Sequence, residues 1–212
     1  MPEDFSDVIP TEAVVATYGG HLVDIINPTV EMIRDEDVFK SLARRCRFGG
    51  FLDTPLDEIY SVAQHAVYVS RIVRMSQDEY DPMAIYHALH HDDPEYILTD
   101  IVSPMKRVLP DYKRLEKMWT PLTNQHFGVI STPFYEKMTH WADRICFMHE
   151  AAQFDRIDVP DRFKFDKLFD LFEGERVLTP SQAYEFFKAE HESLKRQLDE
   201  SGAYEHWTAQ AV

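Results

Sequence analysis

Cysteine is scarce in this sequence: Cys46 and Cys146 are the only two among 212 residues. Two thiols cannot form the disulfide framework that stabilises small secreted domains, and they fit a reduced compartment. The sequence also has no apolar run long enough to cross a bilayer. Its first ten residues carry acidic side chains and no basic segment, unlike a secretory signal. We therefore expect a cytoplasmic protein that does not enter the membrane.

Positive charge is also in short supply, since 22 lysines and arginines face 37 aspartates and glutamates, for a formal net charge of −15. This balance argues against a broad nucleic-acid-binding face and against anionic membranes as partners. A small phosphorylated ligand is compatible with it where basic residues cluster, at 44–47, 106–107 and 113–114. For any single one of these residues, a solvated helix face is the more common explanation.

The sequence does contain clear secondary-structure patterns. Two β-prone runs, 13–18 and 21–26, flank a Gly-Gly pair, which predicts a small hairpin. Further along, apolar residues recur at helical spacing, and Ser61 with Gln64 has the form of a capping box at a helix start. Other helices are expected from about Pro82, over 105–119 despite Pro110, over 132–154, over 163–172 and over 181–198.

No shift in composition divides the chain into parts, and 44% hydrophobic residues are enough for a sizeable core. We expect an all-α fold, a helical bundle with a small N-terminal β-hairpin, in one domain over residues 1–212. Its core would extend over about 18–198. Residues 199–212 would form a loosely attached tail.

Polar side chains interrupt the apolar stripes of the expected helices. His65 lies four residues before Val69, on the side expected to be buried. Asp92, beside His91, lies three residues after Leu89 and also falls on an apolar stripe. Burying an ionised carboxylate without a partner costs several kcal/mol. A divalent cation held by imidazole and carboxylate groups would offset that cost.

A later helix adds Asp143 to this set. Phe147 and Phe154, four and eleven residues further on, indicate that its face is buried, and Glu150 lies on the same side. Taken singly, each of these signals is weak. A lone histidine on an apolar face is more often an ordinary core residue, and Asp143 can pair with a neighbouring arginine. Together, a His, a His-Asp pair and an Asp facing inward from three helices favour a metal site.

The order His65, His91-Asp92, Asp143 resembles the H…HD…D pattern that defines the HD superfamily of metal-dependent phosphohydrolases. This resemblance implies a helical HD fold and a bound divalent metal ion (Mn, Co, Mg, Zn or Fe). It also implies that the four residues of the pattern are the metal ligands.

The resemblance extends beyond the ligands. Residues 60–65 are similar to the S-V-A-[QE]-H segment of small HD nucleotidases, and residues 87–106 to their A-L-L-H-D-x-x-E-x-x-x-x-D-I-x-[ST]-P-x-K block. Residues 46–50 resemble the Arg-aromatic segment before the first ligand, and residues 18–20 resemble the opening of phage-borne and bacterial members. The likeness covers about 18–150, and a phage origin would place the protein in the host cytoplasm.

The resemblance assigns a role to each further matching residue. Glu95 would orient or deprotonate the attacking water, and Asp100 would protonate the leaving oxygen or hold the sugar. Arg47 and Lys106 would bind phosphate. Phe48 would pack on the base or the sugar.

Two features depart from the family pattern. His90 stands where relatives usually carry an aliphatic residue, which leaves the identity of the ligand open by one position. His91 is preferred because it keeps the family spacing to Glu95 and Asp100. Additional histidines at 87, 126 and 140 can feed a second metal, but packing or surface roles are more common for such residues.

The resemblance implies an enzyme that removes phosphate from the 5′ position of a deoxynucleotide, either dNMP or dNTP. Its partner would be this small nucleotide, not a nucleic-acid polymer or a membrane, and by analogy it would form a homo-oligomer. One alternative is a nucleotide-binding sensor that does little chemistry, although a sensor needs neither Glu95 nor Asp100. Another is a helical interaction protein in which the inward His and Asp side chains form a buried hydrogen-bond network.

Overall fold

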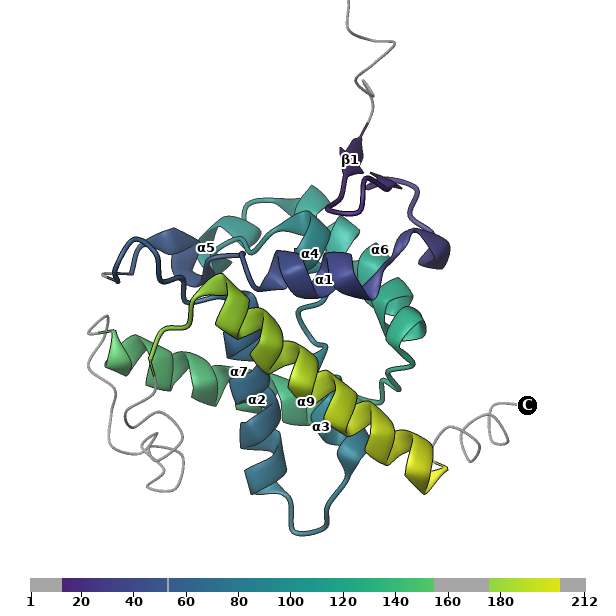
Figure 1. Ribbon diagram of the computed structural model, residues 1–212, viewed down its shortest axis with the longest axis vertical. Coiled ribbons are helices and arrows are strands. Elements are labelled where there is room, and N and C mark those ends of the chain that lie inside the picture. The colour runs from purple at the N-terminus through teal and green to yellow at the C-terminus, as the bar shows by residue number, and fades with distance from the viewer. Residues whose placement is uncertain (1–12, 53, 155–175, 203–212) are drawn as a thin grey trace, which may run out of the picture.

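The computed structural model is mostly helical, with one two-stranded sheet near the N-terminus (Figure 1), as the sequence predicted. It describes residues 13–52, 54–154 and 176–202. In chain order the elements are β1 (Val14–Ala16), β2 (Leu22–Asp24), η1 (Val30–Met32), α1 (Asp35–Leu42), η2 (Arg47–Gly50), α2 (Val62–Ser76), α3 (Pro82–Leu89), α4 (Glu95–Leu98), α5 (Ser103–Lys106), α6 (Pro110–Phe127), α7 (Pro133–Gln153) and α9 (Pro180–Ser201). The helices expected over 132–154 and 181–198 correspond to α7 and α9. The helix expected over 163–172 lies outside the described residues.

The N-terminal hairpin pairs β1 and β2 as an antiparallel ladder in which Val15 lies opposite Val23. Gly20 in the turn has φ of +75°, a conformation that glycine adopts without strain. The buried carboxylate of Asp37, in α1, accepts hydrogen bonds from the Thr17 hydroxyl (2.6 Å) and the Gly19 N–H (3.1 Å). These bonds attach the hairpin to the helical body.

Helix α2 lies at the centre of the fold and packs against α3, α7 and α9 (Figure 1). Ser61 caps it as predicted, since the Gln64 N–H donates to the Ser61 hydroxyl at 3.2 Å. The Gln64 side chain does not complete the capping box. It bonds instead to the Arg176 carbonyl (2.9 Å) and the Leu178 N–H (3.1 Å), which secures the segment leading into α9. Buried hydrophobic side chains form one cluster that reaches from Val23 to Leu198.

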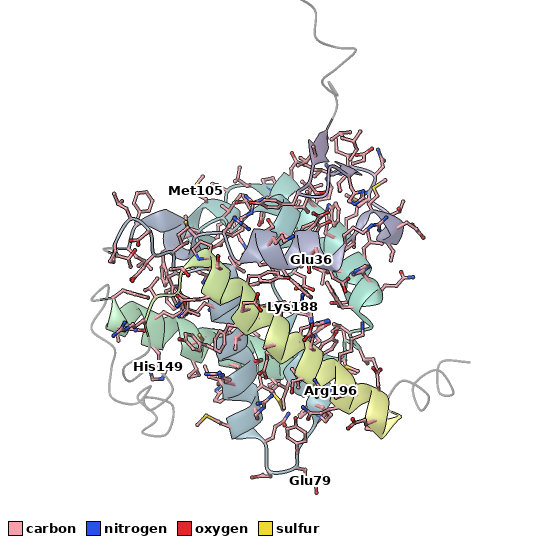
Figure 2. All side chains as sticks on the ribbon, viewed as in Figure 1. Glu36, Glu79, Met105, His149, Lys188 and Arg196 are labelled. Carbon is pink, nitrogen blue, oxygen red and sulfur yellow. The ribbon has the colours of Figure 1, made fainter. Side chains whose placement is uncertain are left out.

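Helix α9 crosses the front of the molecule and contacts α1, α2 and α3. At its solvent side, the Lys188 ammonium lies 3.4 Å from the Glu36 carboxylate of α1 (Figure 2). Because α9 also buries Phe187 and Leu194 completely, this helix belongs to the core. The single-domain organisation stays a prediction.

Two predictions about helix boundaries are wrong. The helix expected over 105–119 is in fact α5 followed by a break, and Pro110 begins α6 because proline suits the first turn of a helix. The helix starting at Pro82 ends at Leu89, so the turn 90–94 that follows is not helical. Within the described ranges, no helix combines the length and apolar character needed to cross a membrane.

Candidate metal centre

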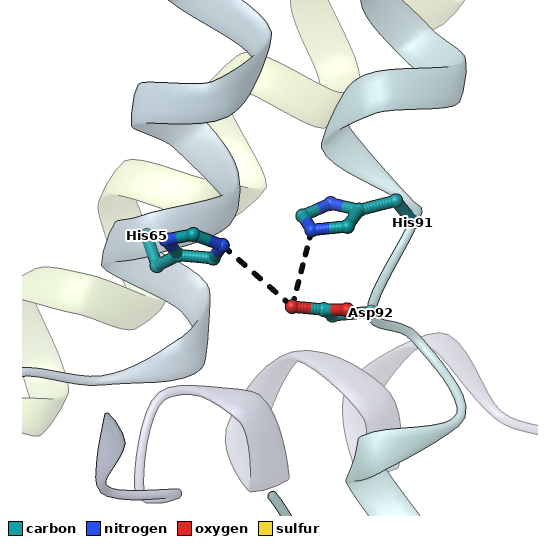
Figure 3. Close-up of side chains that lie close together, drawn as sticks. All are labelled: His65, His91 and Asp92. Carbon is teal, nitrogen blue, oxygen red and sulfur yellow. Dashed lines mark ion pairs between the residues drawn. The ribbon is translucent and has the colours of Figure 1, made fainter. Parts of the chain in front are cut away.

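Three of the four expected ligands converge. His65 comes from α2, whereas His91 and Asp92 come from the turn after α3, and their ligand atoms all lie within 4.8 Å of one another. The Asp92 Oδ2 is 3.1 Å from the His91 Nε2 and 3.7 Å from the His65 Nε2 (Figure 3). The structure thus brings an imidazole pair and a carboxylate to one point, a combination that can hold a divalent ion.

Asp143 approaches the same point from α7. Its Oδ1 lies 3.1 Å from the His65 Nε2, and its side chain is one-third exposed. The expectation that its face of the helix is buried is confirmed at Glu150 and wrong at Phe147, which is 42% exposed. Asp143 therefore lies at the rim of the cluster, where solvent and a small ligand have access.

The donor chemistry of the two imidazoles suits a metal. The Ala88 carbonyl lies 2.8 Å from the His91 Nδ1 and can only accept, so this nitrogen carries a proton. In the neutral ring, the His91 Nε2 then presents a lone pair to the cluster. The Nε2 atoms of His65 and His91 are buried, and neither makes a well-aligned hydrogen bond within the described part of the chain. A cation would satisfy both, so the residues present fit a metal ion.

Charged neighbours shift the pKa values of the cluster residues. Burial opposes the charged form of Asp92, but His91, His65 and the nearby Arg47 guanidinium lower the pKa of its carboxyl well below the usual range. Burial would also lower the pKa of His91, yet Asp92 raises it. The negative field that favours a proton on His91 also favours a metal cation at this position.

His91, not His90, converges with His65 and Asp92, so His91 is the candidate ligand of the two. His90 points away from this cluster and bonds to Asp93 on the far side of the turn. The additional histidines have local partners: the His87 Nδ1 lies 2.8 Å from the Thr139 hydroxyl, and the His126 Nε2 lies 2.7 Å from the Asp35 carboxylate.

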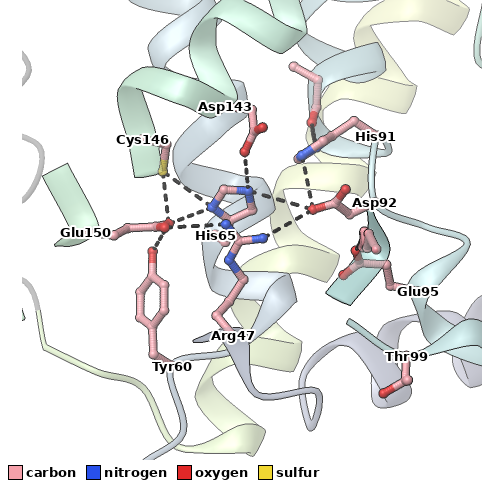
Figure 4. Close-up of polar contacts among 12 residues, drawn as sticks. Arg47, Tyr60, His65, His91, Asp92, Glu95, Thr99, Asp143, Cys146 and Glu150 are labelled. Atoms are coloured by element: carbon pink, nitrogen blue, oxygen red, sulfur yellow. Dashed lines mark hydrogen bonds and ion pairs between the residues drawn. The ribbon is translucent and has the colours of Figure 1, made fainter. Parts of the chain in front are cut away.

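Behind the cluster lies a buried carboxylate that the sequence had placed only on the same side of its helix as Asp143. Glu150, fully buried on α7, lies 2.5 Å from both the Tyr60 hydroxyl and the His65 Nδ1 through its Oε1 (Figure 4). His65 and Arg47 overcome the opposing effect of burial and lower the pKa of Glu150. The carboxylate therefore accepts a hydrogen bond from the His65 Nδ1, and this bond orients the ring so that the His65 Nε2 faces Asp92.

A second group of potential ligands shares His65 but is less suited to a metal. His65, Cys146 and Glu150 also bring ligand atoms within 4.8 Å of one another, and all three are buried. Their polar atoms are already bonded among themselves, with the Cys146 Sγ 3.1 Å from the Glu150 Oε1. Burial and Glu150 raise the pKa of the Cys146 thiol, which keeps it protonated, whereas metals bind the thiolate.

Arg47 lies between Asp92 of the cluster and the buried Glu150 behind it. Its guanidinium lies 3.6 Å from the Asp92 Oδ2 and 3.5 Å from the Glu150 Oε2. The adjacent Phe48 has φ of +56°, rare for a residue with a side chain, and stacks on Phe147 at 5.8 Å between ring centroids. The expected phosphate-binding arginine is thus held by two carboxylates, and the expected base-packing ring lies beside an aromatic partner.

Lys106 and Glu95 form a pair next to the cluster. The Lys106 ammonium lies 2.9 Å from the Glu95 Oε1 and 2.9 Å from the Glu116 Oε1. Glu95 begins α4, after the turn that follows α3. Burial, together with Asp92 and Asp100, outweighs Lys106 and raises the pKa of Glu95 from 4.5 to about 8.

Asp100 follows a strained residue. Thr99 has φ of +67° and ψ of 152°, a region largely restricted to glycine. The Tyr112 hydroxyl donates to the Thr99 carbonyl (2.6 Å), and the Arg45 guanidinium lies 3.3 Å from its hydroxyl. Burial raises the pKa of Asp100, while Arg47 and Lys106 oppose this rise. Asp100 is thus a second carboxyl, beside Glu95, whose pKa Arg47 and Lys106 influence.

The raised pKa of Glu95 predicts a pH-dependent stability in the metal-free protein. Between pH 4.5 and about 8, the folded state holds a proton on Glu95 that the unfolded state releases, so the parent loses stability as pH rises. Glu95→Gln removes this slope. In EDTA, the melting temperature of the variant minus that of the parent should increase from pH 5 to pH 8 and remain constant above pH 8. Identical slopes for the two proteins would contradict the assignment.

Glu150→Ala should destabilise the fold by about 3–5 kcal/mol, because it leaves Arg47 and His65 without their buried carboxylate. Urea unfolding of the metal-free protein measures this loss. Glu150→Gln, which keeps an oxygen acceptor for Tyr60, should cost less. The exposed Lys137→Ala on the same helix serves as control and should change stability by less than about 0.5 kcal/mol. Equal stability of Glu150→Ala and this control would contradict the buried network.

Comparison with known proteins gives two relatives without an assigned activity. The chain is 41% identical over 100 residues to the uncharacterized protein YfdR of Escherichia coli, a match that covers 46% of this chain and half of YfdR. It is 29% identical over 187 residues to an uncharacterized protein of Rhodobacter capsulatus, covering 84% of this chain and 94% of that protein. No family model matches the chain. The similarity to the Rhodobacter capsulatus protein extends over most of the fold.

Proposed function

We propose that this chain is a metal-dependent phosphohydrolase of the HD type that removes phosphate from the 5′ position of a deoxynucleotide. The observation that carries the proposal is the convergence of the buried Nε2 atoms of His65 and His91 on the Asp92 carboxylate, without a well-aligned hydrogen bond to either nitrogen from the described residues. The H…HD…D order of the ligands and the longer segments that resemble small HD nucleotidases support it. The substrate phosphate count stays open between dNMP and dNTP.

The ion would be held by His65, His91, Asp92 and Asp143, of which Asp143 is the most exposed. When bound, it supplies Lewis acidity toward a phosphoryl oxygen and lowers the pKa of water. Glu150 would keep the His65 ring in the required tautomer, and the Ala88 carbonyl would do the same for His91.

Glu95 is the proposed general base. A base works best when its pKa lies near the working pH, and burial brings the pKa of Glu95 to about 8. One oxygen of its carboxyl bonds to Lys106, while the other is buried and makes no hydrogen bond to the described residues. This second oxygen is the atom proposed to take a proton from the attacking water.

The phosphate would be bound by Lys106 and Arg47, and Phe48 would pack against the base or sugar. Both cations now face carboxylates, so an incoming phosphate would compete for them and draw Lys106 away from Glu95. That separation would free Glu95 to accept a proton. Asp100, whose pKa is raised by burial, is proposed to protonate the leaving oxygen or to hold the sugar.

The proposal is tested by phosphate release from all four dNMPs and dNTPs, each with EDTA or with added Mn²⁺, Co²⁺, Mg²⁺, Zn²⁺ or Fe²⁺. We expect release from at least one substrate, dependent on the metal. No turnover of any nucleotide under any condition would end the enzyme proposal. Tight binding of a nucleotide without product over hours would favour the sensor alternative instead.

A purely structural hydrogen-bond network of inward His and Asp side chains is separated from both by elemental analysis of the purified protein. The Nδ1 proton that His91 donates to the Ala88 carbonyl, and the lack of a well-aligned hydrogen bond at the Nε2 atoms of His65 and His91 within the described residues, favour a metal over such a network. Self-association and a cytoplasmic location are part of the proposal by analogy with HD nucleotidases.

A further inference from the structure

The turn that carries His91 and Asp92 has a second face, directed away from the metal centre. There lie His90 and Asp93, which flank the two proposed ligands in the sequence, and each is only 1% exposed. The His90 Nδ1 lies 2.7 Å from the Asp93 Oδ2, so the two side chains bridge the turn from behind. This pair takes no part in the mechanism proposed above.

The pair continues into the C-terminal helix. The His90 Nε2 lies 3.0 Å from the Nδ1 of His191, which α9 buries to 3% exposure. The Tyr86 hydroxyl lies 3.3 Å from the same His191 nitrogen, and Phe127 stacks on the His90 ring at 4.5 Å between centroids. The result is a continuous chain of contacts, Asp93–His90–His191, that links the turn carrying His91 and Asp92 to α9.

Either arrangement of protons satisfies this chain. If Asp93 accepts from the His90 Nδ1, the His90 Nε2 accepts from His191. If Asp93 donates to the Nδ1, the Nε2 donates to His191. The contacts therefore specify a geometry irrespective of the proton positions.

We propose that His191 is a positioning residue for the metal centre, acting through His90. Helix α3 ends at Leu89, so the turn 90–94 lacks the continuous backbone ladder that fixes a ligand within a helix. Side-chain bonds from α9 supply that constraint. The inference rests on the proposed metal site, and it accounts for an imidazole at position 90, where the resembling family usually has an aliphatic residue: in this chain α9 provides its partner.

The test compares Mn²⁺ affinity by titration calorimetry for the parent, His191→Phe and His191→Asn. Phenylalanine keeps the ring volume and removes the nitrogen that faces His90. Asparagine places a hydrogen-bonding atom near the position of the lost Nδ1. We expect His191→Phe to bind Mn²⁺ about 10–100-fold more weakly, the usual effect of losing a group that orients a ligand, and His191→Asn to recover most of the affinity.

A matched control separates positioning from stability. Leu194→Ala removes a fully buried side chain from the same helix, outside the chain of contacts, and should lower the melting temperature while leaving Mn²⁺ affinity unchanged at temperatures where it is folded. Equal weakening by Leu194→Ala and His191→Phe, or no weakening by His191→Phe, would overturn the inference. A parent that binds no Mn²⁺ would instead overturn the proposed function on which the inference rests.

A measurement on the parent needs no variant and covers the case in which His191→Phe does not fold. In ¹⁵N-histidine-labelled protein, Zn²⁺ should shift the ring nitrogens of His65 and His91, and with them those of His90 and His191. The exposed His21 of the N-terminal hairpin provides the reference. A His191 ring that shifts no more than that of His21 would overturn the inference.

Discussion

Asp92→Ala is expected to lose bound metal and to reduce phosphate release by about 10³-fold or more. Asp92 is the carboxylate that approaches the Nε2 atoms of both His91 (3.1 Å) and His65 (3.7 Å), and its removal takes away a ligand and the negative charge beside Arg47. With one negative charge fewer, the site attracts a divalent ion less strongly. Metal content by elemental analysis and turnover under the best conditions for the parent measure the two effects.

Asp78→Ala is the matched control for this substitution. Asp78 is an exposed aspartate in the loop between α2 and α3, and its removal should leave metal content and turnover at parental values. An Asp92→Ala protein that keeps its metal and its turnover would refute the assignment of the ligands. Loss of turnover with full metal content would move Asp92 from ligand to another role.

Glu95→Gln is expected to reduce turnover by about 10²–10⁴-fold while the protein keeps its metal. Glutamine preserves the shape of the side chain and an oxygen acceptor for Lys106, but it cannot accept the proton that the mechanism assigns to Glu95. Because the lost group acts in the chemical step, the decrease should fall mainly on kcat and little on KM. Steady-state kinetics at pH 8 separate the two.

The exposed Glu79→Gln, in the same loop as Asp78, controls for the exchange of a glutamate and should be neutral. A Glu95→Gln enzyme that retains parental kcat would exclude Glu95 as the base. In that case Asp100, the other carboxyl whose pKa Arg47 and Lys106 influence, becomes the candidate to test.

The sequence predicted the positions of the proposed ligands with unequal success. Periodicity placed His65 correctly because α2 is a regular helix of 15 residues in which the apolar spacing holds. The same reasoning reached His91 and Asp92 for a wrong reason, since α3 ends before them and their position comes from a turn. The motif, with its fixed order and spacing, identified them where local periodicity does not apply.

The supporting groups lay beyond local patterns. Glu150 meets Tyr60 and His65 across separations of 90 and 85 residues, and His90 meets His191 across 101. No short-range spacing encodes such contacts, because they arise only when α2, α7 and α9 pack together. A second histidine beside the expected ligand was the one visible signal, and its meaning required the position of α9.

One diffraction experiment tests the central claim most directly. Crystals soaked in Zn²⁺ and measured at the zinc absorption edge should show one anomalous peak at about 2.0–2.2 Å from the Nε2 atoms of His65 and His91 and from carboxylate oxygens of Asp92 and Asp143. A peak between His65, Cys146 and Glu150, or no peak within reach of His65 and His91, would contradict this account.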